Sequence, residues 1–431
     1  MTTKSKPEEL FSSLGERLTA PQITRLMKTA LESPDLLSLA AGFTDTHTLP
    51  REEVLETVQE LLAEPEGTEC LQYGTNQGRP LLRWLLAARL AEQDGADTPP
   101  DSAPLFVTNG SQQALALALQ TLCDPGDIVL VERPTYFVFL ELARGLGIDL
   151  RSLPSDDAGT LDSNRLGDLL HNWKQEGCLD RLKAVYLVSY FSNPSSRSIP
   201  ETEKEELGAV LAEHGASPAL IEDAAYRELY FDAPYPARSI LGIRALESFP
   251  RLYTGTCTKP FATGLKVGFA VCPDMTWRER MLYLKGQQDF GTANFNQAIL
   301  ENVLESGRYE SYVDSMRQHY RKKKDTLSRI FRDEGLASMG WKWEEPKGGL
   351  YFWMQAPNNL DTGSESAFCR QALENGVLYV PGELCHADPA TSRHHVRISF
   401  GVLRNDQLEE AGRRFVATAR QFSKARKTDS T

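Results

Sequence analysis

The sequence has 431 residues, of which 47 are Lys or Arg and 59 are Asp or Glu, for a formal net charge of −12. Its 41% hydrophobic and 25% charged residues are typical of a globular protein and exclude a mainly disordered or fibrous chain. The acidic balance argues against nucleic-acid binding, and no apolar run reaches the roughly 18–20 residues of a membrane helix. Because the first ten residues show no targeting signal, we expect a cytoplasmic protein that binds neither nucleic acid nor membrane.

The cysteines and histidines do not form a metal-binding pattern. The seven cysteines are scattered and never form CxxC, which is typical of reduced, mostly buried thiols. The adjacent His394 and His395 would point to opposite faces of a strand, so they are poorly placed to chelate one ion. The short basic run at residues 321–324 is expected to be a solvated helix face.

The N-terminal part is predicted to contain few regular elements. Residues 1–20 are polar with little periodicity, so we expect a flexible arm, followed by a helix over 23–31. An apolar, strand-like stretch covers 35–41. Apolar residues at helical spacing predict helices over 51–62 and 80–90.

Six short apolar runs then follow, several of them separated by helical stretches. The runs cover 105–108, 128–131, 184–188, 219–221, 252–254 and 267–271, and helices are predicted over 112–122 and 136–146. Near-continuous apolar runs are typical of strands buried on both faces, and their alternation with helices predicts a mostly parallel α/β sheet. Ligands of such sheets bind beyond the carboxyl ends of the strands, so polar residues after each run are candidate site residues.

After residue 312 the pattern changes to a smaller α+β domain. We expect a long charged helix over 312–334, strands over 341–343, 349–354, 378–380 and 396–400, and helices over 364–375 and 406–424. The predicted division has three parts: an N-terminal arm and helix (1–50) that belong to the small domain, a large domain (51–315) and the small C-terminal domain (316–431).

Polar residues follow two of the predicted strands. One set suits a bound anion and the other a bound cation. Ser111 opens a helix whose backbone N–H groups suit a phosphate, although a plain N-cap is the simpler interpretation. Glu222 and Asp223 end a buried strand, where an acid requires a cation. A protonated ring nitrogen and an internal arginine are both possible partners.

Three further residues suit amino-acid chemistry. Lys259 follows a strand and is placed for Schiff-base formation, the alternative being an ordinary surface lysine. Because side chains alternate along a strand, Arg397 lies on the opposite face from its apolar neighbours. It therefore points either to solvent or into a cleft, where it would bind a carboxylate. Asn193 offers an amide to the same group.

The order and spacing of these features resemble the fold-type I pyridoxal-phosphate aminotransferases of class I/II, especially the α-aminoadipate/kynurenine aminotransferase group. The resemblance extends from about residue 23 to the C-terminal helix. It is carried by Gln72-Tyr73-Gly74, Asn193-Pro194, Asp223-Ala224-Ala225-Tyr226 and Thr258-Lys259. It implies an α/β fold, in which a large domain binds pyridoxal 5′-phosphate with a mostly parallel seven-stranded sheet between helices, beside a smaller α+β domain.

The resemblance also implies roles for residues around the cofactor ring. Lys259 forms the internal aldimine and later moves a proton. Asp223 keeps the pyridine nitrogen protonated, so the ring acts as an electron sink. Tyr226 and Asn193 bind the ring 3′ oxygen, and Tyr136 stacks on the ring face.

The implied phosphate-binding set departs from the family pattern at one position. The resemblance assigns the phosphate cup to Ser111, Gln112, Thr256 and Thr258. The family usually has an arginine seven residues after the Schiff-base lysine, where this chain has Lys266. A lysine keeps the charge but loses the two-pronged geometry, so we expect weaker or differently arranged phosphate binding.

The remaining implied roles concern the substrate and a second subunit. Arg397 binds the substrate α-carboxylate and Gly42 supplies a backbone contact beside it. Tyr73 reaches the phosphate of the neighbouring subunit, which implies a homodimer with shared active sites. Arg25 would meet the distal carboxylate of an acidic substrate if it points into the site. Otherwise, residues that could line a pocket for aromatic or aliphatic side chains are Phe43, Tyr351 and Phe352.

The resemblance thus predicts an aminotransferase that moves an amino group from an L-amino acid to a 2-oxo acid, with 2-oxoglutarate expected as the acceptor. One alternative is a pyridoxal-phosphate-dependent lyase or decarboxylase on the same scaffold, since fold alone does not determine the reaction. A cofactor-sensing transcriptional regulator is a second alternative. It is disfavoured because only about 20 residues precede the matching region.

Overall fold

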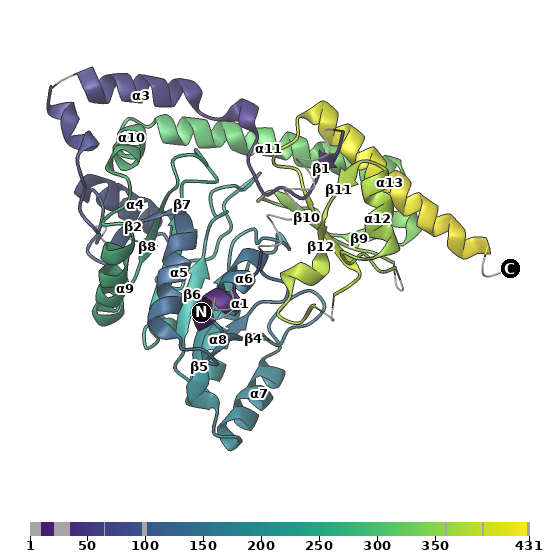
Figure 1. Ribbon diagram of the computed structural model, residues 1–431, viewed down its shortest axis with the longest axis horizontal. Coiled ribbons are helices and arrows are strands. Elements are labelled where there is room, and N and C mark those ends of the chain that lie inside the picture. The colour runs from purple at the N-terminus through teal and green to yellow at the C-terminus, as the bar shows by residue number, and fades with distance from the viewer. Residues whose placement is uncertain are drawn as a thin grey trace, which may run out of the picture.

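The computed structural model describes residues 10–20, 35–63, 65–96, 101–357, 360–389 and 392–428. A seven-stranded sheet forms its largest part (Figure 1), with the strand order β2-β8-β7-β6-β5-β3-β4. These strands are β2 (Leu105–Asn109), β3 (Ile128–Val131), β4 (Asp149–Ser152), β5 (Leu182–Val188), β6 (Ala219–Asp223), β7 (Arg251–Thr256) and β8 (Val267–Val271). Only β8 runs antiparallel to its neighbours, so the expected mostly parallel sheet is confirmed.

Helices cover both faces of this sheet because successive strand residues point to opposite sides. Val129 and Val131 of β3 belong to a core formed with α5, α6 and α9, whereas Ile128 and Leu130 pack with α7 and α8. The helices are α4 (Pro80–Gln93), α5 (Gly110–Leu122), α6 (Phe137–Gly145), α7 (Ser163–Gln175), α8 (Glu201–Glu213), α9 (Met275–Gln288) and α10 (Asn294–Glu305).

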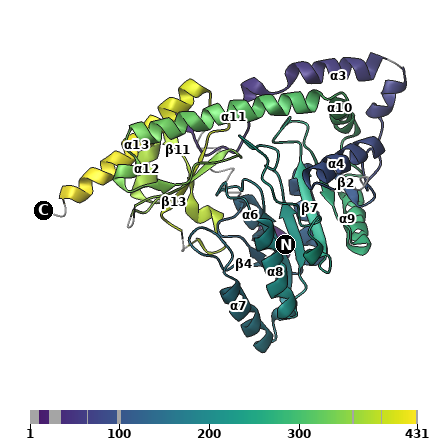
Figure 2. The same ribbon diagram turned by 180° about the vertical axis from the view of Figure 1, so that it is seen from behind.

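A smaller, antiparallel sheet forms the C-terminal part, with the order β12-β13-β10-β9. Its strands are β9 (Lys342–Trp343), β10 (Tyr351–Gln355), β12 (Val380–Pro381) and β13 (His395–Ser399). The accompanying helices are α11 (Arg308–Asp333), α12 (Ala367–Glu374) and α13 (Asn405–Thr428). Figure 2 shows α11 extending from α10 near the large sheet to α13 beside the small one.

The N-terminal segment reaches both parts of the molecule. The short strand β1 (Leu37–Ser38) pairs in parallel with β11 (Val377–Leu378), and α3 (Arg51–Ala63) follows at the top of Figure 1. Short 3-10 helices are η2 (Thr46–Thr48), η3 (Pro65–Leu71), η4 (Leu179–Arg181), η5 (Arg244–Leu246), η6 (Ala337–Met339) and η7 (Gly382–Cys385). Among the helices that the structure describes, none is both long and apolar enough to cross a membrane.

All six predicted apolar runs are strands of the large sheet. The seventh strand, β4, has no apolar run because it lies at the sheet edge, where Asp149 and Arg151 are partly or fully exposed. The single strand expected over 378–380 is wrong. Its residues divide between β11, which pairs with β1, and β12, which pairs with β13.

The expected flexible arm is wrong for residues 10–20. Residues Ser13–Arg17 form the short helix α1, and Arg17 Nε donates a hydrogen bond to the Gly145 carbonyl at 3.1 Å. This segment therefore contacts α6 of the large sheet. The helix expected over 23–31 lies outside the described residues.

The basic run of α11 is only partly solvated, which corrects the expected exposed face. Lys323 is fully buried, and its Nζ donates to Asp45 Oδ2 and to the Gly401 carbonyl, both at 2.7 Å. Burial alone would raise the pKa of Asp45, but hydrogen bonds from Lys323 and the His47 amide lower it. This pair fixes residues 42–45 beside the small sheet.

Replacement of Lys323 with Met is expected to lower the free energy of unfolding by about 3–5 kcal/mol, because it removes the buried cation from the Asp45 carboxylate. Among the described residues, this carboxylate then keeps only the His47 amide and the His319 ring as hydrogen-bond partners. Urea titration followed by circular dichroism measures this loss. The double variant Lys323→Met/Asp45→Asn should lose less than the sum of its single changes. Lys322→Met, at the exposed neighbouring position, is the control and should stay within about 0.5 kcal/mol of the parent.

Candidate active site

A cavity of about 130 Å³ lies where β5, β6 and β7 end and α5 begins. Ten of its fourteen lining residues are candidates from the sequence analysis: Ser111, Gln112, Tyr136, Asn193, Asp223, Tyr226, Thr256, Thr258, Lys259 and Lys266. The other four are Asn109, Gly110, Val188 and Ala225. Strand-end polar residues from five distant stretches of sequence therefore meet in one place, as the parallel sheet requires.

The neighbouring acids Glu222 and Asp223 lie on opposite sides of β6. Glu222 Oε1 accepts from the buried Lys204 Nζ at 2.6 Å, so this acid belongs to the core. Asp223 lines the cavity, where its Oδ2 accepts from the Tyr186 hydroxyl at 2.9 Å and its Oδ1 from the Ala225 amide at 3.1 Å. Burial raises the pKa of Asp223 to about 6, and the structure gives it no arginine partner among the described residues.

Lys259 lies inside the cavity rather than on the surface. Its Nζ donates to the Gly42 carbonyl at 2.6 Å. Burial, together with the positive charges of Arg397 and Lys266, lowers the pKa of Lys259 to about 8. A lysine with this pKa has a substantial neutral fraction near neutral pH, as a nucleophile or a proton acceptor requires.

The start of α5 forms an anion cradle. Gly110 has φ +68°, and a Cβ on Gly268 would lie 2.5 Å from the Gly110 carbonyl carbon, so both positions suit only glycine. Gln112 Oε1 is buried without a hydrogen-bond partner in the described structure. The N-cap of α5 is Asn109, not Ser111, which corrects the simpler interpretation of Ser111.

Hydroxyl and ammonium groups complete this end of the cavity. Thr256 Oγ1 donates to Thr258 Oγ1 at 2.8 Å and accepts from the Thr258 amide at 3.1 Å. Lys266 also lines the cavity and adopts φ +57°. These donors lie on the same side as the α5 N-terminus, whose dipole favours an anion.

Arg397 points into the molecule and not to solvent. It is 1% exposed, and its Nη1 donates to Asn193 Oδ1 at 2.8 Å while its Nη2 donates to the Ala40 carbonyl at 2.6 Å. The guanidinium carbon lies 4.4 Å from the centroid of the Tyr351 ring. Arg397 Nε is buried and unpartnered among the described residues, so one donor remains for a ligand.

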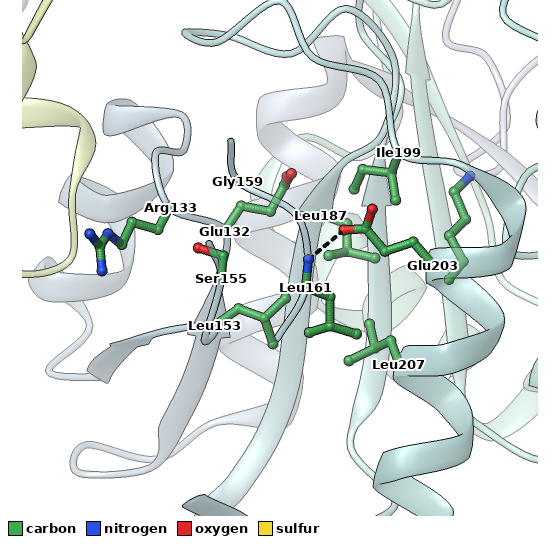
Figure 3. Close-up of a pocket in the computed structure, with 11 residues that line it drawn as sticks. Glu132, Arg133, Leu153, Ser155, Gly159, Leu161, Leu187, Ile199, Glu203 and Leu207 are labelled. Carbon is green, nitrogen blue, oxygen red and sulfur yellow. Dashed lines mark hydrogen bonds between the residues drawn. The ribbon is translucent and has the colours of Figure 1, made fainter. Parts of the chain in front are cut away.

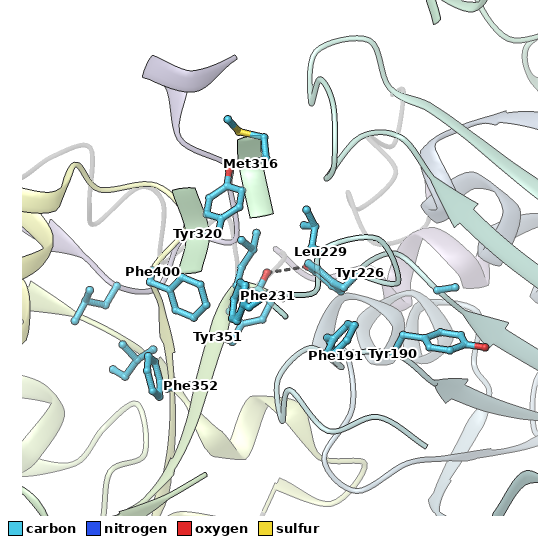
Figure 4. Close-up of a cluster of buried hydrophobic side chains, with 14 of the residues drawn as sticks. Tyr190, Phe191, Tyr226, Leu229, Phe231, Met316, Tyr320, Tyr351, Phe352 and Phe400 are labelled. Carbon is cyan, nitrogen blue, oxygen red and sulfur yellow. Dashed lines mark hydrogen bonds between the residues drawn. The ribbon is translucent and has the colours of Figure 1, made fainter. Parts of the chain in front are cut away.

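Two tyrosines and a glycine close the cavity on the side of the small sheet. The hydroxyls of Tyr226 and Tyr351 lie 2.8 Å apart and point toward one another in Figure 4. A Cβ on Gly42 would lie 2.8 Å from the Tyr351 hydroxyl, so only glycine fits there. Burial raises the pKa of Tyr226 well above its usual value, so its hydroxyl stays protonated.

Phe352 does not line the site, contrary to the expectation for a substrate pocket. It follows Tyr351 in β10 and therefore points to the opposite face, where it is fully buried against Phe331 and Phe400. Figure 4 shows Phe352 and Phe400 on the far side of β10 from Tyr226. Phe43 is 44% exposed.

Tyr73 does not line this cavity. Tyr73 is 80% exposed and meets the 67% exposed Phe290 edge to face, with ring centroids 5.7 Å apart. Arg25 lies outside the described residues.

Sequence reasoning missed two positioning residues. Tyr186 holds Asp223 and stacks on Phe139, with centroids 3.7 Å apart. Asp289 accepts hydrogen bonds from Asn109 at 2.9 Å and Gln113 at 2.7 Å, which fixes the start of α5. Both contacts join residues far apart in sequence. The only local signal was the polar hydroxyl of Tyr186 in an otherwise apolar strand.

Residues 34–415 match the family model for aminotransferase class I and II. The chain belongs to this family. An aromatic-amino-acid aminotransferase of Thermococcus litoralis is 29% identical, covering 97% of this chain and 95% of its own length. A 2-aminoadipate transaminase of Thermus thermophilus is 30% identical, covering 94% and 95%. The solved kynurenine aminotransferase of Pyrococcus horikoshii, crystallised with PMP, has a TM-score of 0.84 at 28% identity and covers 97% of this chain and 98% of its own.

This aminotransferase is a pyridoxal-phosphate-dependent enzyme, and the cavity fits that cofactor. The unpartnered Gln112 oxygen, the glycine cradle and Lys266 surround the place for a phosphate. At the other end Asp223, held by Tyr186, faces the cavity, where its carboxyl group would suit a protonated ring nitrogen. The residues at one end of the cavity therefore fit the phosphate of the cofactor, and the acid at the other end fits its ring nitrogen.

Proposed function

We propose that the enzyme transfers the amino group of an L-amino acid to 2-oxoglutarate, with Lys259 as the covalent attachment point of the cofactor. The observation that carries this proposal is one cavity that joins a low-pKa lysine and a buried acid, with a buried arginine bonded to its lining residue Asn193. Bound pyridoxal phosphate supplies an electron-withdrawing ring that stabilises charge developing beside the amino group.

In the proposed mechanism, each residue acts at a defined end of the cavity. Asp223 stays ionised against a protonated ring nitrogen, since a cation beside it offsets the cost of burial. The neutral Lys259 amine removes and returns the substrate Cα proton. Tyr226 and Asn193 donate to the ring oxygen, and Tyr136 covers one ring face.

Arg397 is proposed to hold the α-carboxylate of the substrate. Its Nη1 donates to Asn193, which lines the cavity, and its unpartnered Nε leaves one donor for a carboxylate. The Gly42 backbone lies beside it. Relatives whose names include aromatic amino acids and 2-aminoadipate support a donor with an aromatic or long side chain.

We further propose a homodimer in which Tyr73 reaches the phosphate of the partner subunit. The exposed pair of Tyr73 and Phe290 supports this, because such apolar surface usually marks an interface. A division into residues 51–315 and a small domain of 1–50 and 316–431 is supported by the pairing of β1 with β11. Seven free cysteines support a reducing, cytoplasmic location.

The test is the visible spectrum of the holoenzyme during addition of L-glutamate and then 2-oxoglutarate. Transamination predicts loss of the cofactor band with glutamate and its return with the oxo acid. Release of ammonia with an oxo acid from a single substrate would instead indicate elimination. If the cofactor band did not change with glutamate but changed with aromatic amino acids, only the proposed donor–acceptor pair would be rejected.

Replacement of Lys266 with Met is expected to weaken cofactor affinity about 10–100-fold, because one charge-assisted hydrogen bond to phosphate contributes about 1.5–3 kcal/mol. Fluorescence titration of the apoenzyme with pyridoxal phosphate measures this. Since Lys266 lowers the pKa of Lys259, the pH midpoint of covalent attachment should also rise above about 8 in the variant. An unchanged affinity would remove Lys266 from the phosphate site. Lys322→Met is the matched control.

A further inference from the structure

A second cavity, of about 430 Å³, lies between the two sheets and shares no lining residue with the cofactor cavity. Its volume falls within the range of about 300–1,000 Å³ that small-molecule sites occupy. One wall consists of the loop after β3, residues 157–160, and the segment that follows Asn193-Pro194. The opposite wall is the face of β9, β10 and β13.

One face of the small sheet serves both cavities. Tyr351 and Arg397 cover the cofactor cavity, and Trp353 and Gln355 continue the same face of β10 at intervals of two residues. Trp353 is paired in register with Arg397. This second half of the face carries polar and amphipathic side chains, whereas simple packing between two sheets would favour apolar residues.

Two cations face this second cavity from opposite walls without a partner. Arg133 and Lys342 are both exposed, and neither side chain makes an ion pair or hydrogen bond in the part of the chain that the structure describes. In Figure 3 the Arg133 guanidinium projects toward the C-terminal part, away from the apolar pocket that its neighbours line. The side-chain amide of Gln355 is likewise unpartnered among those residues.

The other charges of this cavity favour a ligand with a single negative charge. Arg197 is paired with Glu203. The Glu132 carboxylate accepts a hydrogen bond from the Val188 amide, and burial raises the pKa of Glu132 to about 8, so it is largely uncharged at neutral pH. Asp157 and Glu344 are also present, and they would repel a polyphosphate.

The cavity also has an aromatic wall. Trp353 stacks on His395, with centroids 5.2 Å apart and planes 6° apart, and His386 lies 6.1 Å from the same indole. His386 is 5% exposed, and both of its ring nitrogens lack partners in the described structure. Burial lowers the pKa of both histidines to about 4 or below, so this wall is neutral and flat.

We propose that this cavity is a second ligand site that binds a small aromatic carboxylate, with the carboxylate on the Arg133 guanidinium and the ring against Trp353. The fork of an arginine matches a carboxylate bidentately, and an indole favours a flat ring. Lys342 approaches the same anion from the opposite wall.

Two short segments join this site to the active site. Arg133 lies three residues before Tyr136, and Ser195 lies two residues after Asn193. The existence of the second site does not depend on which amino acid the enzyme uses.

The test is calorimetric titration of the holoenzyme with indole-3-acetate, which has neither an amino group nor an oxo group to react. We expect binding at micromolar to millimolar concentration, weakened at least tenfold in Arg133→Gln and in Lys342→Gln. Both positions are exposed, so folding is preserved. Arg413→Gln, an exposed arginine of α13, is the matched control and should bind as the parent does.

Two readouts separate this site from the cofactor cavity. The probe should still bind Arg397→Gln, and it should leave the visible spectrum of the bound cofactor unchanged in the parent enzyme. Loss of binding in Arg397→Gln with full binding in Arg133→Gln would place the probe in the active site and overturn the proposal. An absence of binding at millimolar concentration would overturn it too.

Discussion

Replacement of Lys259 with Ala is expected to reduce the rate of amino transfer about 10²–10⁴-fold. The lysine is the cavity's amine, and its Nζ is directed at the Gly42 carbonyl beside Arg397. Without it, no other amine of the cavity is placed to take the Cα proton, since Lys266 lies at the phosphate end. Steady-state assays of oxo-acid formation measure the loss.

The Lys259 prediction has two controls. Lys322→Ala removes an exposed lysine of α11 and should leave turnover unchanged. Cofactor titration of Lys259→Ala should still show binding, because the phosphate cradle is intact. Retention of more than about one-hundredth of parental activity would show that another group moves the proton and would contradict the assignment.

The lowered pKa of Lys259 explains why a lysine suits this position. At an ordinary pKa of about 10.4, fewer than about one lysine in a thousand is neutral at pH 7. At the pKa of about 8 in this cavity, roughly a tenth is neutral. With this pKa, the neutral fraction reaches one half at about pH 8 and levels off roughly one pH unit higher.

The sequence was most informative where chemistry follows a buried strand. Six apolar runs predicted six strands, and the polar residues after them include Asp223, Asn193 and Lys259. The rule that ligands lie beyond strand ends brings such residues together without knowledge of any contact. The alternation of side chains along a strand shows only that Glu222 and Asp223 face opposite sides. The resemblance to the family was needed to decide which of them faces the site.

The sequence was least informative about pairs that are distant along the chain. Lys323 reads as one member of a basic run, and only its contact with Asp45 shows that it is buried. Phe352 and Tyr351 are both aromatic, and the sequence does not show which of them faces the cavity. The register of β10 against β13 decides this. The second cavity has no sequence signal, because its walls come from six separate segments.

Replacement of Arg397 with Gln is expected to lower kcat/KM about 10²–10³-fold, which corresponds to about 3–4 kcal/mol. The buried guanidinium has no water to replace its contact with a carboxylate, so removal leaves the substrate's charge unpaired. It also releases Asn193 and the Ala40 carbonyl, which it now holds at 2.8 and 2.6 Å.

The pattern of kinetic constants for Arg397 variants distinguishes binding from orientation. A guanidinium that only binds carboxylate raises KM and leaves kcat unchanged, whereas one that also orients the Cα–H bond lowers kcat as well. Because Arg397 is fixed through Asn193, which lines the cofactor cavity, we expect both constants to change. Arg397→Lys keeps the positive charge but loses the two-pronged geometry of the guanidinium. Its kcat/KM should lie between those of the parent and Arg397→Gln. If Arg397→Gln retained parental kcat/KM for every amino donor, the substrate carboxylate would have to bind elsewhere, and Arg397 would be a structural link between Asn193 and Ala40.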